Sequence, residues 1–336
     1  MAIDVASRST GAQTEATPEP PKPDVPFAVE TRSLRKVYGR SVAVAGLSLT
    51  VRQGEVFGFL GPNGAGKTTS VKMLMGLIRP TSGEARLLGR PLGDREAKRK
   101  IGFLPELFRF HDWLSGEELL DFHGKLYGMS AAERRRRVPE VLELVGLAHR
   151  RKDPLRSYSK GMQQRAGLAQ ALLNDPSVVF LDEPTSALDP MGRLEVRNII
   201  RDLRHAGKTV FLNSHLLSEV EMVCDRVTII NGGEVAATGT VRDLVKREPV
   251  VDLVIGAWRP EIATLLEQRG IIRDLEQTSS GRTTIRLALI DDEAIAQVVE
   301  DLVLAAAPVY AVTPHAPTLE ELFLEIVSAS GQGSEH

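Results

Sequence analysis

Apolar and polar positions along the chain predict a parallel β-sheet with helices packed on it. Short runs that are almost entirely apolar occur at residues 55–60, 178–182 and 209–213. Runs of this length and composition are typical of parallel strands that are buried on both faces. Residues 68–77 instead repeat apolar positions at helical spacing, directly after the first run. We therefore expect a strand, a loop and a helix, in this order, within an α/β domain.

The pattern changes near residue 246, where shorter elements begin. Strands are predicted at 251–255, 271–276, 283–289 and 309–312, and helices at 260–269 and 293–306. Pro260 near the start and Gly270 past the end support the first of these helices. The order βαββαβ predicts a small α+β domain of ferredoxin-like type. A last helix is expected at residues 319–327, which read LEELFLEIV.

The segment GPNGAGKT at residues 61–68 fits the phosphate-loop pattern G-x-x-x-x-G-K-[ST] and lies between the predicted strand and helix. Glycines let backbone N–H groups turn toward a phosphate, and a helix N-terminus adds positive potential. Lys67 is expected to reach the β- and γ-phosphates, and Thr68 to offer a hydroxyl to Mg²⁺. The loop residues predicted to bind nucleotide are Gly61, Pro62, Asn63, Gly64, Ala65, Gly66, Lys67, Thr68 and Thr69. A glycine-rich turn that matches by accident is the alternative.

Two adjacent carboxylates end the second apolar run. Asp182 is expected at the carboxyl edge of the sheet, where it holds Mg²⁺ directly or through water. Because strand side chains alternate, Glu183 points elsewhere and is predicted to polarise an attacking water. Taken alone, two acids after an apolar run are also explained as a solvated strand end.

Residues 27–245 resemble the ATP-binding cassette (ABC) ATPases. The segment YSKGMQQR at 158–165 looks like the family's signature sequence and lies shortly before LDEPTSALD at 181–189, a pair that other phosphate-loop families lack. The commonest signature reads LSGGQ. Here Tyr158, Lys160 and Met162 replace Leu, Gly and Gln, whereas Ser159 and Gly161 remain. Both remaining residues would lie at a helix start, where a hydroxyl and a bare backbone can face an anion.

The resemblance implies a P-loop cassette fold, with a mixed sheet core, an antiparallel β subdomain and a helical subdomain inserted at about 106–175. Two cassettes would sandwich two ATP molecules head to tail, so that Ser159 and Gly161 meet the γ-phosphate held by the partner's phosphate loop. Tyr38 would stack on adenine, Asp189 would cross the dimer interface, and His215 would contact the γ-phosphate. A strand-end core tyrosine and a polar cap are the plainer explanations of Tyr38 and His215.

Glu106 departs from the family pattern, which most often has glutamine at this position. A carboxylate can still meet the metal through oxygen, but it adds negative charge beside Asp182 and Glu183. In this respect the chain resembles the exporter-type branch of the family, in which glutamate also occurs at this position. The resemblance thus assigns catalysis to Glu183, His215, Lys67 and Glu106, and the Mg²⁺ site to Thr68, Asp182 and Glu106.

Composition excludes some classes of function. A net charge of −2 over 336 residues gives no global basic face, so no nucleic-acid partner is expected. The cluster from Arg134 to Arg137 is interpreted as a solvated helix face. The single cysteine, Cys224, permits no disulfide within the chain. We see no apolar run of membrane-spanning length and no signal-peptide pattern in residues 1–26, so the chain is expected neither to cross a membrane nor to be exported. The resemblance implies a peripheral subunit at the cytoplasmic face of the cell membrane.

The expected parts are a disordered tail at 1–26, the ABC ATPase domain at 27–245, an accessory domain at 246–328 and a disordered tail at 329–336. The resemblance implies the ATPase subunit of a transporter of the exporter-type branch, with ATP and Mg²⁺ as cofactors. Its partners would be a second copy of itself and a membrane permease that docks near Phe108, Phe110, Trp113 and Leu114. A soluble ABC ATPase that acts on ribosomes or DNA is the alternative. The sequence does not identify the cargo.

Overall fold

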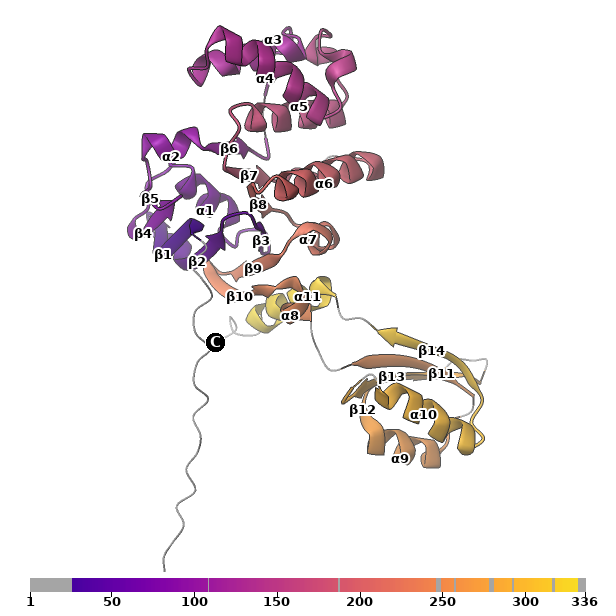
Figure 1. Cartoon of the computed structure of the whole chain (residues 1–336). Helices are drawn as coiled ribbons and strands as arrows, with labels where there is room; N and C mark the ends of the chain where they lie inside the picture. The colour runs from indigo at the N-terminus through magenta and orange to yellow at the C-terminus, as the bar shows by residue number, and fades with distance from the viewer. Residues whose placement is uncertain are drawn as a thin grey trace, which may run out of the picture.

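The computed structural model describes residues 26–107, 109–186, 188–245, 249–256, 258–277, 281–291, 293–315 and 318–331. Figure 1 shows the arrangement of the elements. Most of the segment expected to be an N-terminal tail, and the side chain of Phe108, lie outside the described residues.

A six-stranded sheet forms the centre of the cassette. Its strands are β3 (Val56–Leu60), β6 (Ile101–Leu104), β7 (Val178–Asp182), β8 (Thr209–Asn213), β9 (Arg226–Asn231) and β10 (Glu234–Thr240). The order is β10-β9-β3-β8-β7-β6, and all neighbouring strands are parallel except β9 and β10. The three apolar runs of the sequence are therefore central strands, as expected.

Alternate side chains of each central strand serve two different cores. Val56 and Leu60 of β3 pack in the core that also holds helices α5 (Lys160–Leu172), α6 (Pro190–His205) and α7 (Leu217–Val223). Phe57 and Phe59 point to the opposite face, where Phe59 and Phe211 have ring centroids 5.3 Å apart. Since both faces are covered, no position of β3 can be polar, and this explains the unbroken apolar run.

A second, antiparallel sheet covers this opposite face together with α1 (Lys67–Leu74). Its strands are β1 (Phe27–Tyr38), β2 (Ser41–Arg52), β4 (Ser82–Leu87) and the short β5 (Arg90–Pro91), in the order β2-β1-β4-β5. The helix α2 (Arg95–Arg99) leads from this sheet into β6. Sheet, helix and the phenylalanines of the central strands share one apolar core.

A helical lobe lies between β6 and β7, at the top of Figure 1. It contains α3 (Gly116–Leu126), α4 (Ala131–Leu144), two short 3₁₀ turns, Ala148–Arg150 and Leu155–Ser157, and α5. A capping box precedes α3: Ser115 Oγ accepts from the Glu118 N–H, and Glu118 Oε2 accepts from the Ser115 N–H at 2.8 Å. Ser130 and Glu133 form a second box at the start of α4. Each box satisfies two otherwise unpaired backbone N–H groups at the start of a lobe helix.

The C-terminal part has the predicted order βαββαβ: β11 (Val250–Ile255), α9 (Pro260–Arg269), β12 (Gly270–Gln277), β13 (Thr283–Leu289), α10 (Glu293–Leu304) and β14 (Val309–His315). The sheet is antiparallel, in the order β12-β13-β11-β14, and encloses an apolar core of its own with the two helices.

The last helix, α11 (Leu319–Gly331), packs on the cassette instead of this sheet. Leu319 is fully buried in the cassette core, and α11 lies beside α7 and α8 (Val241–Val245), as Figure 1 shows for α8. The helix also runs to Gly331, past its expected end at residue 327. Among the described residues, no helix is both long and apolar enough to cross a bilayer.

Candidate nucleotide site

The phosphate loop connects β3 to α1, as the sequence predicts. Gly64 and Gly66 have φ angles of 82° and 99°, a region that strongly favours glycine. A Cβ atom on Gly66 would lie 2.3 Å from the carbonyl oxygen of Ala43, and one on Gly61 would lie 2.4 Å from that of Ile230. The loop therefore fits against β2 and β9 only with glycine at these positions. The other predicted loop residues, Pro62, Asn63, Ala65, Thr68 and Thr69, lie in the same turn and first helical turn.

Lys67 is folded back onto this loop. Its Nζ donates to the carbonyl oxygens of Gly61, at 2.6 Å, and Pro62, at 3.2 Å. Burial lowers the pKa of Lys67, and the negative charges of Glu183, Asp182 and Glu106 oppose this effect. The ammonium thus lies within electrostatic reach of the three predicted acids.

Asp182 ends β7 and Glu183 follows it; both are buried, with 4% and 8% of their surface exposed. Burial raises the pKa of each carboxyl group. For Asp182, the amide of Asn213 opposes this rise, and the charge of Glu106 adds to it. A solvated strand end, the simpler explanation of these acids, does not describe them.

Glu183 has a left-handed backbone, with φ at 52°. Such a conformation is costly for a residue other than glycine, and it is typical of sites where geometry has a function. The Glu183 carboxylate Oε2 lies 2.7 Å from Nδ1 of His215, and hydrogen bonding and charge from His215 oppose the burial effect on the pKa of Glu183. The predicted catalytic pair is therefore in direct contact.

Asn213, which was not predicted from the sequence, connects both acids. Its side-chain amide donates to Oδ1 of Asp182, and its backbone carbonyl oxygen accepts from the backbone N–H of Glu183 at 2.8 Å. Asn213 is only 2% exposed, and its Oδ1 has no hydrogen-bond partner among the described residues. The signal was its place at the end of β8, directly opposite Asp182 in the parallel register.

Tyr38 and Glu106 are both exposed on the surface of the cassette. Tyr38 is half exposed and is therefore not a core tyrosine, and Lys36 Nζ lies 4.9 Å from its ring centroid. Glu106 is exposed, directly after β6, and its charge acts on both Lys67 and Asp182. Both residues are accessible to a ligand.

The signature segment forms the start of α5, in the helical lobe. Ser159 is the N-cap, with its Oγ accepting from the Met162 N–H at 3.2 Å. A Cβ on Gly161 would come no closer than 3.5 Å to any other group, so this chain itself does not require glycine there. Tyr158, which departs from the family pattern, is buried; its hydroxyl donates to Arg150 O at 2.8 Å and lies over Gly116.

Asp189 acts within its own chain as a helix cap. Its Oδ1 accepts from the Gly192 N–H at 2.8 Å, and Pro190 follows at the first position of α6. This is a favourable helix start. The carboxylate remains exposed at the surface of the cassette.

The arrangement fits a nucleoside triphosphate. The loop offers backbone N–H groups, a helix N-terminus and an ammonium to anionic phosphates. Thr68 and Asp182 offer hard oxygen atoms, which Mg²⁺ prefers together with phosphate oxygens and water. Within the part of the chain that the structure describes, no three His, Cys, Asp or Glu side chains form a metal cluster.

An uncharacterised ABC transporter ATP-binding protein of Nostoc sp. is 51% identical over 231 residues, which are 66% of this chain and 69% of that relative. The chain belongs to the ABC transporter family. The sequence model of that family, described as ABC transporter, matches residues 44–186. This segment includes the phosphate loop, the signature and both acids, so the protein is an ABC ATPase that binds ATP or ADP.

Two further relatives have names that state a process. The linearmycin resistance ATP-binding protein of Bacillus subtilis is 36% identical over 252 residues, 74% of this chain and 81% of that relative. The Nod factor export ATP-binding protein I of Cupriavidus pinatubonensis is 37% identical over 267 residues, 78% of this chain and 81% of that relative.

A solved structure confirms the cassette fold. It is a dimeric, post-hydrolysis ATP-binding cassette bound to ADP and phosphate, and it matches with a TM-score of 0.58 at 29% identity. The match covers 64% of this chain and 99% of that one. It therefore extends over one whole cassette.

Proposed function

We propose that this protein is the ATP-hydrolysing subunit of an export-type ABC transporter, which dimerises around two Mg-ATP and drives a separate membrane permease. One observation supports the hydrolytic part: the ends of three neighbouring strands bring together Lys67, Asp182 and Glu183, which are buried, and His215, which is about half exposed and contacts Glu183. The charges of both acids act on Lys67. Export is supported by the relatives named for linearmycin resistance and Nod factor export. The permease would hold the complex at the cytoplasmic face of the membrane.

Bound Mg-ATP would supply the phosphoryl group and a divalent charge. Lys67 and the loop N–H groups would bind phosphate oxygens, which requires Nζ to exchange the carbonyls of Gly61 and Pro62 for the ligand. Thr68 and Asp182 would hold Mg²⁺, with Glu106 nearby. Glu183 would orient a water molecule and accept its proton, while His215 fixes the Glu183 carboxylate.

A second copy of the chain would complete each site. Ser159 and Gly161 are exposed or partly exposed at a helix N-terminus, and nothing within the chain requires glycine at 161. Glycine at position 161 would instead allow a ligand held by another copy of the chain to approach the backbone closely. Because both copies have the same sequence, both sites would be competent. Asp189 would lie between them, and Tyr38 would stack on the base.

The permease would dock at a pocket of about 240 Å³ between β6 and the helical lobe. Phe103, Phe110 and Phe122 give it apolar walls, and His111 and His123 add two imidazoles. Phe122 is 43% exposed, so an incoming side chain could cover it. Of the residues expected here, Phe110 lines the pocket; Leu114 packs on the core, Trp113 is exposed against His111, and Phe108 is not described.

The decisive experiment is to tag the Glu183→Gln chain, extract it gently from native membranes with Mg-ATP, and identify co-purifying proteins by mass spectrometry. Glu183→Gln should retain ATP and hold the complex closed. A stoichiometric multi-helix membrane protein is the expected result. Glu267→Gln, the same change at an exposed position of α9, is the matched control. Recovery with ribosomal or DNA-bound partners and without a membrane protein would contradict the proposal.

A further inference from the structure

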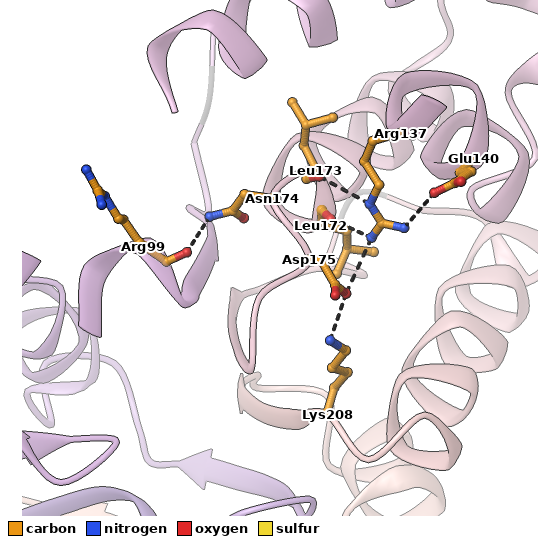
Figure 2. A network of polar contacts seen from close by, with 8 residues as sticks. All are labelled: Arg99, Arg137, Glu140, Leu172, Leu173, Asn174, Asp175 and Lys208. Carbon is orange, nitrogen blue, oxygen red and sulfur yellow. Dashed lines mark hydrogen bonds and ion pairs between the residues drawn. The ribbon is translucent and has the colours of Figure 1, made fainter. Parts of the chain in front are cut away.

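Arg137 of α4 contacts the end of another helix. The sequence predicts a solvated helix face at residues 134–137, and Arg135 and Arg136 are indeed exposed. The Arg137 side chain is only 23% exposed and reaches the C-terminal end of α5, as Figure 2 shows. The prediction was wrong for Arg137 because α5 returns alongside α4 in the folded lobe. It was also wrong for Arg134, whose side chain is 15% exposed and pairs with Asp121.

The guanidinium caps α5. Arg137 Nη2 donates to Leu172 O at 3.0 Å, and Nε donates to Leu173 O at 3.2 Å. Carbonyls in the last turn of a helix have no partner within the helix, and the helix dipole places negative potential there. A planar cation with several donors suits this position better than a lysine would. Glu140, one turn along α4, accepts from Nη1 at 3.2 Å and orients the guanidinium.

A chain of ion pairs connects Arg137 to the six-stranded sheet. Arg137 Nη2 lies 3.7 Å from the carboxylate of Asp175, which accepts from Lys208 Nζ at 2.7 Å. Lys208 directly precedes β8, the strand that ends at Asn213. Beside Asp175, the Asn174 side chain donates to Arg99 O at 2.8 Å, at the end of α2 (Figure 2). The connector after α5 thus joins the lobe to two elements of the core.

The opposite end of α5 carries the signature residues. The helix has 13 residues, so Ser159 lies about 20 Å from the Arg137 contact. A tilt of about 5° at the Arg137 end would move Ser159 by roughly 1.7 Å at this length. Such a shift exceeds what a hydrogen bond tolerates. The backbone of α5 near this end is also close to β6, since a Cβ on Gly102 would lie 2.1 Å from Ala171 O.

We propose that Arg137 is a positioning residue that fixes the tilt of α5, so that Ser159 and Gly161 are presented to the ATP held by a second copy of this chain. The inference rests on the proposed function, because it requires that two copies close on shared ATP. Arg137 itself contacts no nucleotide. Its loss should therefore weaken closure of the dimer but leave the chain's own phosphate loop intact.

The test separates these two steps in a Glu183→Gln background. Binding of a fluorescent ATP analogue to dilute, monomeric protein reports the chain's own site, and sedimentation velocity with Mg-ATP reports dimerisation. Arg137→Met should raise the dimer dissociation constant about tenfold, the effect of losing charged hydrogen bonds. Its affinity for the analogue should stay within about twofold. The dimer dissociation constant of Arg137→Lys should lie between those of the parent chain and Arg137→Met, since lysine keeps the charge but lacks the planar set of donors of arginine.

Arg136→Met is the matched control, because it removes an exposed arginine from the same helix. Equal dimerisation of Arg137→Met and Arg136→Met would overturn the inference alone. If Arg137→Met does not fold, as judged by circular dichroism, Asp175→Asn decides: asparagine adopts the left-handed backbone of Asp175 (φ 52°) but removes the charge. Weaker dimerisation of Asp175→Asn is then expected, and an unchanged value contradicts the inference. A parent chain that does not dimerise with Mg-ATP overturns the proposed function as well.

Discussion

His215 Nδ1 lies 2.7 Å from Glu183 Oε2, and this contact joins the ends of two neighbouring parallel strands, β7 and β8. Glu183 has a left-handed backbone, so both its backbone conformation and its contact with His215 orient the carboxylate. Burial raises the pKa of Glu183, and the contact with His215 opposes the rise. The contact therefore favours the ionised form of this buried carboxylate, which the proposed role as a base requires.

Replacing His215 should change the pH dependence of hydrolysis. In His215→Ala, the pKa of Glu183 loses an influence that lowers it and should rise further. Glu183 must be ionised to accept a proton, so the acidic limb of the profile of kcat/KM against pH should move to higher pH. His205→Ala, at the exposed end of α6, should leave the limb in place. An unmoved limb in His215→Ala would mean that Glu183 is not the titrating base.

Asn213 is expected to position both acids. Asn213→Val keeps the β-strand but removes the amide that donates to Asp182, and turnover should fall about tenfold or more, as for loss of a buried hydrogen bond to a charge. The Mg²⁺ concentration for half-maximal ATPase activity should rise, because Asp182 is less well oriented. Asn213→Ser retains a donor and should recover part of the activity. A normal Mg²⁺ dependence in Asn213→Val would argue against this role.

Gly64 and Gly66 provide a matched pair in the phosphate loop. Both have positive φ, but a Cβ on Gly64 meets nothing within 4 Å, whereas one on Gly66 meets Ala43 O at 2.3 Å. Gly64→Ala should cost about 1–2 kcal/mol of unfolding free energy, from backbone strain alone. Gly66→Ala should cost more, about 3 kcal/mol or above, and should also abolish ATP binding because the loop must shift. Chemical denaturation and nucleotide titration measure both effects, and equal losses would refute the steric argument.

Glu106 is expected to support turnover. Glu106→Gln removes a carboxylate proposed to assist Mg²⁺ binding, and with it a negative charge that favours the charged form of Lys67. Steady-state ATPase activity should fall at unchanged ATP affinity. Glu84→Gln, an exposed position on β4, is the control. Higher activity in Glu106→Gln, with the same affinity, would show that the carboxylate hinders the reaction.

The pocket at the helical lobe predicts where the permease binds. Phe122→Asp places a charge on an apolar wall and should reduce recovery of the permease with the tagged chain about tenfold or more, with basal ATPase activity retained. Leu304→Asp, at an exposed apolar position of α10, should not change recovery. Intact permease binding in Phe122→Asp would show that the permease does not dock at this pocket.

The sequence by itself determined the features that depend on short stretches of chain. The apolar run Val178–Asp182 predicted a buried strand and GPNGAGKT predicted the anion loop, because each signal lies within a few residues. The signature and LDEPTSALD segments then identified the family. The βαββαβ order of the C-terminal part followed from the same local patterns.

Only the tertiary structure decided which distant side chains meet. Asn213 contacts Asp182 across 31 positions of sequence, and Arg137 contacts Leu172 across 35, and neither pair has a pattern that a local reading can detect. The placement of α11 on the cassette was also beyond reach, since an amphipathic helix shows that it has an apolar face but not what covers it. Local periodicity fixes elements, whereas contacts between them depend on how the strands are ordered in the sheet.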